Sequence, residues 1–151
     1  MVDELLAANN FYYFPEPTYY RYPANTDNIF EAYLNNPDLF EEYPIHDDYL
    51  ILRHYDLKKD LESITRQGQS EATRHKFYYY KGMIDKLFEL IDQDEEMHQY
   101  QLAMEYNELK SKLSKASNEL TKENLNVYYY FKGQSDILKQ LILNAPIVTK
   151  T

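Results

Sequence analysis

Hydrophobic residues recur at intervals of three and four positions through most of the chain, which is the spacing of one face of an α-helix. Between Asp56 and Asn144 there is no proline, and this stretch holds all three glycines of the chain. The apolar runs are Leu57, Leu61 and Ile64; Phe77, Tyr80, Ile84, Leu87 and Ile91; and Leu102, Tyr106, Leu109, Leu113, Ala116, Leu120, Val127, Tyr130, Ile137 and Leu141. This pattern predicts an all-α body.

The connections between these helices are marked less clearly. An acidic stretch, 92–96, follows the second run and is the best candidate for a turn, in which Asp94 would cap the next helix. The third run keeps a period of about 3.5 residues, which is typical of a coiled-coil seam and also of an ordinary bundle core. We therefore predict a long antiparallel helical hairpin or, with a second turn near 116–118, a three-helix bundle. We favour one long helix after the first turn, because neither glycine nor proline marks a second turn.

The first part of the chain has a different pattern, because proline interrupts it. Five of the six prolines precede residue 45. Only short helices fit between them: one from a cap at Asn25 or Thr26 to Leu34, and one with Pro37 at its first position. The stretch 10–25 holds three prolines and is predicted to be extended or rich in turns. We expect an irregular, Pro/Tyr-rich N-terminal arm that contains short helices.

Charge divides the chain at a similar place. The net charge is -9 at pH 7. Residues 1–52 hold ten acids and one base, whereas residues 53–151 hold fifteen acids and fifteen bases. We therefore divide the chain into an acidic aromatic arm, 1–52, and a helical body, 53–151.

Aromatic residues distinguish this arm from a disordered acidic tail, which is poor in them. The arm holds twelve Phe and Tyr residues. Rigid rings that keep a polar tip are enriched at protein interfaces. The arm residues predicted to contact a partner are Phe11, Tyr12, Tyr13, Phe14, Tyr19, Tyr20 and Tyr22. The alternative is that the arm buries these rings against its own helical body.

The helical body contains an internal repeat. Residues 77–91 align with residues 128–142 at an offset of 51, with eight of fifteen positions identical and two that exchange Phe and Tyr. Each copy places a glycine inside a helix, which costs about 1 kcal/mol relative to alanine, so we expect another backbone or a ring to approach Gly82 and Gly133 closely. Four consecutive aromatic residues cover every side of a helix, so some rings must leave the core. The repeat residues predicted to contact a partner are Tyr78, Tyr79, Tyr129 and Tyr130. The alternative is that the two copies pack against each other.

The repeated pattern aromatic–Lys–Gly–x–x–Asp–x–Leu–x–x–Leu resembles helices of small accessory proteins of tailed bacteriophages. The resemblance covers only residues 77–91 and 128–142. The frequent use of Tyr, Asn, Lys and Ile also resembles that of proteins from AT-rich viral or bacterial genomes. The resemblance implies a virion or assembly component rather than an enzyme, and it transfers no functional residue.

The residue types exclude several kinds of chemistry. The chain has no Cys, so thiolate catalysis and Cys-ligated metal sites are excluded. Three scattered glycines cannot build a phosphate-binding loop. Of the four histidines only His98 stands in a Glu-x-x-His pattern, and a di-iron site requires a second such pair. We expect His46 to begin a helix after Pro44 rather than to bind a metal. We expect no cofactor, no metal site and no enzymatic activity.

Two functions from different classes fit the sequence. The first is a non-enzymatic structural or assembly protein that oligomerises with or docks on partner proteins, such as the capsid, connector or tail-associated components of a phage virion. The alternative is an acidic inhibitory binder that imitates DNA on a nucleic-acid enzyme. Direct nucleic-acid binding is disfavoured because the aromatic part is acidic, and no apolar run is long enough for a membrane span. The N-terminus lacks the basic region of a signal peptide, so we expect the virion or the host cytoplasm as its location.

Overall fold

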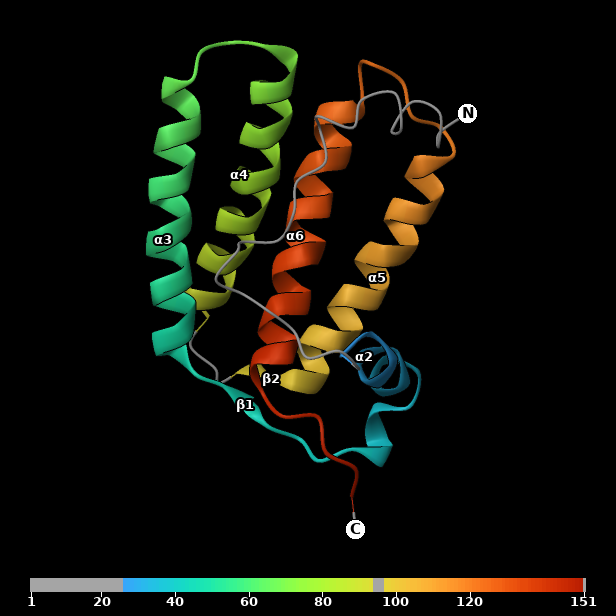
Figure 1. Cartoon of the computed structure of the whole chain (residues 1–151). Helices are drawn as coiled ribbons and strands as arrows, with labels where there is room; N and C mark the ends of the chain where they lie inside the picture. The colour runs from blue at the N-terminus through green and yellow to red at the C-terminus, as the bar shows by residue number, and fades with distance from the viewer. Residues whose placement is uncertain (1–25, 94–96, 151) are drawn as a thin grey trace.

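The computed structural model describes residues 26–93 and 97–150, and these form a helical bundle. Four long helices stand side by side in the order α3, α4, α6 and α5 (Figure 1). The elements are α2 (Thr26–Asn35), the 3₁₀ helix η2 (Pro37–Leu39), β1 (Pro44–Ile45), α3 (Asp47–Arg66), α4 (Glu71–Ile91), β2 (Met97–His98), α5 (Gln99–Ser117) and α6 (Leu125–Asn144). The prediction of an all-α fold with short helices before the body is confirmed.

The bundle consists of two helical hairpins, α3–α4 and α5–α6 (Figure 1). The first hairpin turns at Gly68, whose φ of 101° suits glycine, and Ser70 caps α4 by accepting the Thr73 N–H at 3.1 Å. The second turns through residues 118–124. The bundle therefore has four long helices rather than the two or three expected.

The prediction of one long helix between 96 and 144 is wrong, and side-chain hydrogen bonds explain why. Asn124 Oδ1 accepts the Thr121 N–H at 2.7 Å, and Asn124 Nδ2 donates to the Glu119 carbonyl at 3.0 Å. These bonds offer the backbone partners outside a helix. The hydrophobic period continues through the turn because both flanking helices present apolar faces to the same core.

The short helices of the first part lie where proline and capping residues predicted them. α2 begins at Thr26 and ends before Pro37, and Pro37 is the first residue of η2. Phe30 and Tyr33 of α2 are buried in the same core as Leu57. α3 runs through the expected boundary between residues 52 and 53, so the helical body begins at Asp47 and residues 26–45 pack onto it.

A short ribbon of two strands, each two residues long, lies at the end of the bundle opposite the hairpin turns (Figure 1). β1 and β2 are antiparallel, with Ile45 opposite Met97. The residue after β1, His46, is the N-cap of α3, as expected, and His98 is the N-cap of α5. The cap predicted at Asp94 is therefore not the one that begins α5, and Asp94 itself lies outside the described residues.

Candidate docking surfaces

The two copies of the repeat pack against each other, on α4 and α6. A Cβ atom added at Gly82 would lie 2.0 Å from the Tyr130 carbonyl oxygen, and one at Gly133 would lie 2.0 Å from the Tyr79 carbonyl oxygen. The predicted close approach at both glycines is confirmed, and the neighbour is backbone in each case. This packing agrees with the alternative stated for the repeat, in which its two copies pack against each other.

Polar side chains repeat the same reciprocal arrangement. Tyr79 donates its hydroxyl hydrogen to Asp136 at 2.5 Å, and Tyr130 donates to Asp85 at 2.7 Å. The two hydrogen bonds are equivalent, because at the offset of 51 Tyr79 corresponds to Tyr130 and Asp85 corresponds to Asp136. The repeat is therefore a two-sided interface within one chain.

The equivalence extends to the first helix of each hairpin, which the sequence analysis missed. Residues of α3 match residues of α5 at an offset of 52, and the β1 residue Ile45 faces its own equivalent, Met97, across the ribbon. The matching leucines are Leu50 and Leu102, Leu57 and Leu109, and Leu61 and Leu113, and the first two pairs are buried in the core. Leucines at these positions, each 52 residues from its partner, are the signal that could have revealed a duplicated strand–helix–helix unit.

Two buried cations link the hairpins. Arg53 on α3 donates to Gln140 Oε1 on α6 at 2.7 Å. At the equivalent place in the other half, Lys86 on α4 pairs with Glu105 on α5 and with Glu89 at 3.1 Å. Burial lowers the pKa of Lys86, but the hydrogen bonds and charges of Glu105 and Glu89 outweigh it, so the pKa is raised overall. The amine therefore stays protonated at neutral pH and is not a nucleophile.

The structure separates the aromatic residues that were predicted to contact a partner. Tyr79 and Tyr129 are buried in the core of the bundle. Tyr78 and Tyr130 are half-buried at its surface. Because buried rings offer no surface to a partner, we correct the partner-contact prediction for Tyr79 and Tyr129. The arm residues Phe11, Tyr12, Tyr13, Phe14, Tyr19, Tyr20 and Tyr22 lie outside the described residues.

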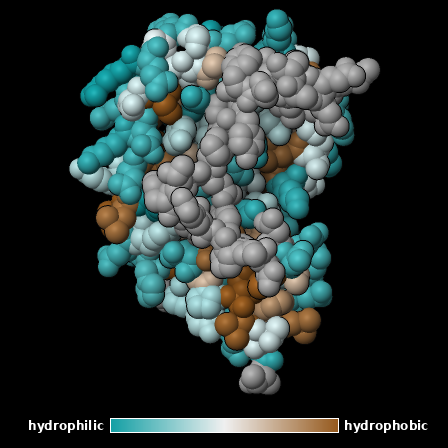
Figure 2. All heavy atoms as spheres, viewed as in Figure 1, coloured by the Kyte–Doolittle hydropathy of each residue, from teal (hydrophilic) through white to brown (hydrophobic). Residues whose placement is uncertain are grey.

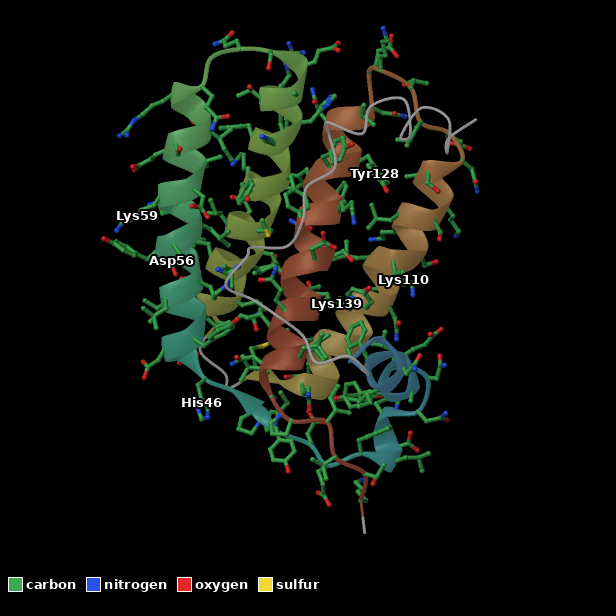
Figure 3. The ribbon with its side chains drawn as sticks, in the orientation of Figure 1. His46, Asp56, Lys59, Lys110, Tyr128 and Lys139 are labelled. Carbon is green, nitrogen blue, oxygen red and sulfur yellow. The ribbon has the colours of Figure 1, made fainter. Side chains whose placement is uncertain are left out.

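Acidic side chains gather at the end of the molecule that carries the ribbon. The exposed acids of residues 26–52 are Glu31, Asp38, Glu41, Glu42, Asp47 and Asp48. No Lys or Arg occurs in residues 26–52, and the nearby C-terminal segment adds Lys150, whose N–H donates to the Leu39 carbonyl at 2.9 Å. We name these six acids the acidic end. His46, at the start of α3, lies at this end in Figure 3.

Exposed hydrophobic side chains adjoin these acids. Leu39 and Val148 flank the antiparallel Phe40–Thr149 bridge, with Leu39 opposite Lys150 and Val148 opposite Glu41, and they are 59% and 45% exposed. Figure 2 shows hydrophobic surface at this lower end and at the edge formed by α3. A mixture of exposed acids and large apolar side chains is suited to binding a protein surface.

Two small clefts lie at the hairpin turns, at equivalent places. The cleft of the first hairpin has a volume of about 310 Å³ and is lined by Ile64 and Phe77, among others. The cleft of the second has a volume of about 240 Å³ and is lined by their equivalents, Ala116 and Tyr128. Their equivalence indicates that they arise from the shape of a hairpin end, which both halves share.

The titratable side chains of the described residues form no group of three or more that could hold a metal ion. His75 is buried, with its ring 5.1 Å from that of Tyr129, and burial lowers its pKa. His75 is therefore neutral at pH 7 and packs in the core. None of the helices of residues 26–93 and 97–150 combines the length and the hydrophobicity that crossing a membrane requires.

Comparison of the chain with protein-family models, with curated proteins and with solved structures found no match. The function proposed below is therefore inferred from the surfaces of the described residues.

Proposed function

We propose that this protein is a non-enzymatic structural or assembly protein that docks on partner proteins through the acidic end, as a capsid, connector or tail-associated component of a phage virion. The observation that carries the proposal is the set of six exposed acids, beside exposed Leu39 and Val148, at one end of the bundle. Such a surface fits a basic protein surface with apolar contacts.

The two buried cations support a structural role rather than catalysis. The buried cations Arg53 and Lys86 are engaged in links between helices. A reactive lysine needs a lowered pKa, whereas that of Lys86 is raised. The polar groups inside the bundle therefore stabilise the fold.

The test removes charge from the acidic end and leaves the fold intact. We would replace Glu31→Gln, Asp38→Asn, Glu41→Gln and Asp48→Asn together. Glu42 is kept, because its carboxylate accepts the Tyr100 N–H at 2.6 Å. A matched control removes four acids elsewhere, Glu62→Gln, Glu108→Gln, Glu119→Gln and Glu123→Gln, all of which are exposed. Both variants change the net charge by the same amount.

The measurement is binding of the full chain to the proteins encoded beside its gene, by light scattering of the mixtures. We expect the acidic-end variant to bind at least about tenfold more weakly and the control to bind like the wild type, since charges within about 10 Å act on a partner at 0.1 M salt. Binding that is unchanged in the acidic-end variant, or reduced equally in both variants, would contradict the proposal.

The same acids favour a second function, inhibition of a nucleic-acid enzyme by imitation of DNA. This alternative predicts that double-stranded DNA competes with the protein for its partner, with strong dependence on salt. The assembly proposal predicts that DNA does not compete. Competition by DNA, lost in the acidic-end variant, would therefore favour the alternative.

A further inference from the structure

The interface between the two hairpins is self-complementary in shape. The helical glycine of α4 meets the Tyr130 backbone, and the helical glycine of α6 meets the Tyr79 backbone in the same way. Contacts that repeat with the roles exchanged define a two-fold interface, in which one kind of surface serves both sides. The surface of α4 that receives α6 therefore has the backbone shape to receive the α4 of a second copy as well.

The ribbon obeys the same two-fold relation. Ile45 and Met97 are equivalent at the offset of 52, and they face each other across the antiparallel pair. Both side chains are buried. If the α3–α4 hairpins of two copies paired with each other, Ile45 of one copy would therefore face Ile45 of the other. Shape alone thus permits pairing between like hairpins of two copies as well as pairing within one chain.

Two buried sites between the hairpins differ in charge although their positions are equivalent. At the offsets of 52 and 51, the matching positions are Arg53, Ile137 and Gln140, which we name the arginine site, and Glu105, Lys86 and Glu89, which we name the lysine site. Arg53 is 2% exposed and donates to Gln140, whereas Lys86 is 6% exposed and pairs with Glu105. One site therefore has a cation where the other has a carboxylate.

Pairing of like hairpins would bring the wrong charges together. Between two α3–α4 hairpins, Arg53 of one copy would lie beside Lys86 of the other, with only Glu89 to compensate both cations. Between two α5–α6 hairpins, Glu105 would lie beside the α6 residues of the arginine site, and neither of these is charged. Removing a charge from water without a partner is strongly destabilising. Both like pairings are therefore disfavoured.

The other charges near Arg53 do not alter this comparison. The carboxylates of Asp56 and Asp60 also act on Arg53 through their charge. Both belong to α3, so they accompany Arg53 whichever hairpin is its partner. The difference between the two pairings therefore comes from the arginine and lysine sites.

We propose that these unlike charges determine which hairpin the α4 surface accepts. It binds an α5–α6 hairpin and excludes the α3–α4 hairpin of a second copy. Specificity of this kind comes from the cost of the wrong pairing as well as from the contacts of the right one. The chain thus pairs its own two halves even where its copies are concentrated.

The test uses one thiol on the two-fold axis of the ribbon, since the chain has no Cys. Residues directly opposite in antiparallel strands have Cα atoms about 4.5–5.5 Å apart, which suits a disulfide. In the full chain with Ile45→Cys, pairing of two α3–α4 hairpins places two thiols face to face. Pairing of unlike hairpins places the thiol opposite Met97, so a disulfide-linked dimer reports like pairing.

The variant that removes the discrimination is Lys86→Met, Glu105→Leu in the Ile45→Cys background. It takes one charge of each sign out of the lysine site, so the net charge of the chain is unchanged. The chain is refolded from urea at about 1 mM, near the effective concentration of two tethered halves, and is then oxidised. We expect at least about tenfold more disulfide-linked dimer than with Ile45→Cys alone, because like pairing no longer carries its electrostatic cost.

The matched control is Lys110→Met, Glu108→Leu in the same background, at two exposed positions of α5. It removes the same charges and adds the same apolar groups but leaves the lysine site intact, so its dimer yield should equal that of Ile45→Cys alone. A second variant, Lys86→Ile, Glu89→Gln, Glu105→Arg, gives the lysine site the residues of the arginine site. It should raise the yield as the first variant does, and circular dichroism confirms that each protein is folded.

Equal dimer yields with and without the lysine-site substitutions would overturn the inference. Abundant dimer in Ile45→Cys alone would overturn it too, because like hairpins would then pair despite their charges. A rise in the matched control as large as that in Lys86→Met, Glu105→Leu would attribute the dimers to added apolar groups and would also contradict the inference. No residue of the acidic end belongs to either site, so these results are independent of the proposed function.

Discussion

At the residue scale, the two helical glycines allow the backbones of α4 and α6 to approach each other closely. Glycine inside a helix is unfavourable unless something requires the missing side chain. The sequence predicted a close approach at Gly82 and Gly133, and the structure identifies the Tyr130 and Tyr79 backbones as the neighbours. The identity of the neighbour was not predictable, because a repeat in one sequence does not say whether its copies meet within one chain.

Alanine at either glycine should destabilise the protein. In an unobstructed helix, Gly→Ala stabilises by about 0.5–1 kcal/mol. Here a Cβ would lie 2.0 Å from a carbonyl oxygen, so Gly82→Ala and Gly133→Ala should each lower the free energy of unfolding by about 1–3 kcal/mol or more. Urea unfolding followed by circular dichroism measures this. The exposed Ser111→Ala is the control, and a gain in stability in either glycine variant would show that the two helices are not in contact there.

A second residue-scale prediction concerns alkaline pH. Burial and the hydrogen bond to Asp85 raise the pKa of Tyr130 to about 12, from an ordinary value of 10.0. Since the neutral form is favoured in the folded state, this stabilisation is complete below about pH 10 and is lost as the pH rises through about 12.

In Tyr130→Phe the free energy of unfolding should therefore decrease less above about pH 10 than it does in the wild type. The free energy of unfolding, measured at about pH 9 and about pH 11, should fall less in Tyr130→Phe than in the wild type. Tyr55→Phe, at an exposed ring, should behave like the wild type. If Tyr130→Phe and the wild type lose the same stability over this range, the hydroxyl is not held by Asp85 as described.

At the element scale, capping residues and proline predicted more than hydrophobic period did. Pro37 and the polar residues around Thr26 located α2 and η2, and Pro44 and His46 located the start of α3. The hydrophobic period did not predict the turn between α5 and α6, because both helices present apolar residues to one core. That turn depends on hydrogen bonds of Asn124 rather than on glycine or proline.

The links between elements involve side chains far apart in the sequence, which no local pattern predicts. Lys86 on α4 and Glu105 on α5 form such a link. Lys86→Met leaves Glu105 without its partner and should lower the free energy of unfolding by about 1–3 kcal/mol. The double variant Lys86→Met, Glu105→Leu removes both charges and should recover most of this loss. Urea unfolding of the two variants distinguishes the outcomes, and equal losses in both would mean that Lys86 acts through packing alone.

At the scale of the whole molecule, the described chain consists of two equivalent helical hairpins, α3–α4 and α5–α6. The repeat at 77–91 and 128–142 was visible in the sequence, but the leucines that extend it to α3 and α5 were recognised only once the helices were paired. The charge division predicted an acidic part, yet residues 26–52 of that part belong to the packed body, because Phe30 and Tyr33 are buried in its core. The acidic end is thus a surface of the bundle.

The central claim is that this surface makes the protein a component of a larger assembly. Under the proposed function that assembly is a virion, and quantitative mass spectrometry of particles purified from cells that express the chain together with the genes beside its own tests this most directly. The proposal predicts a fixed number of copies per particle, and the loss of those copies when Glu31, Asp38, Glu41 and Asp48 are neutralised together. Absence of the protein from particles, with its recovery on a nucleic-acid enzyme instead, would contradict the proposal.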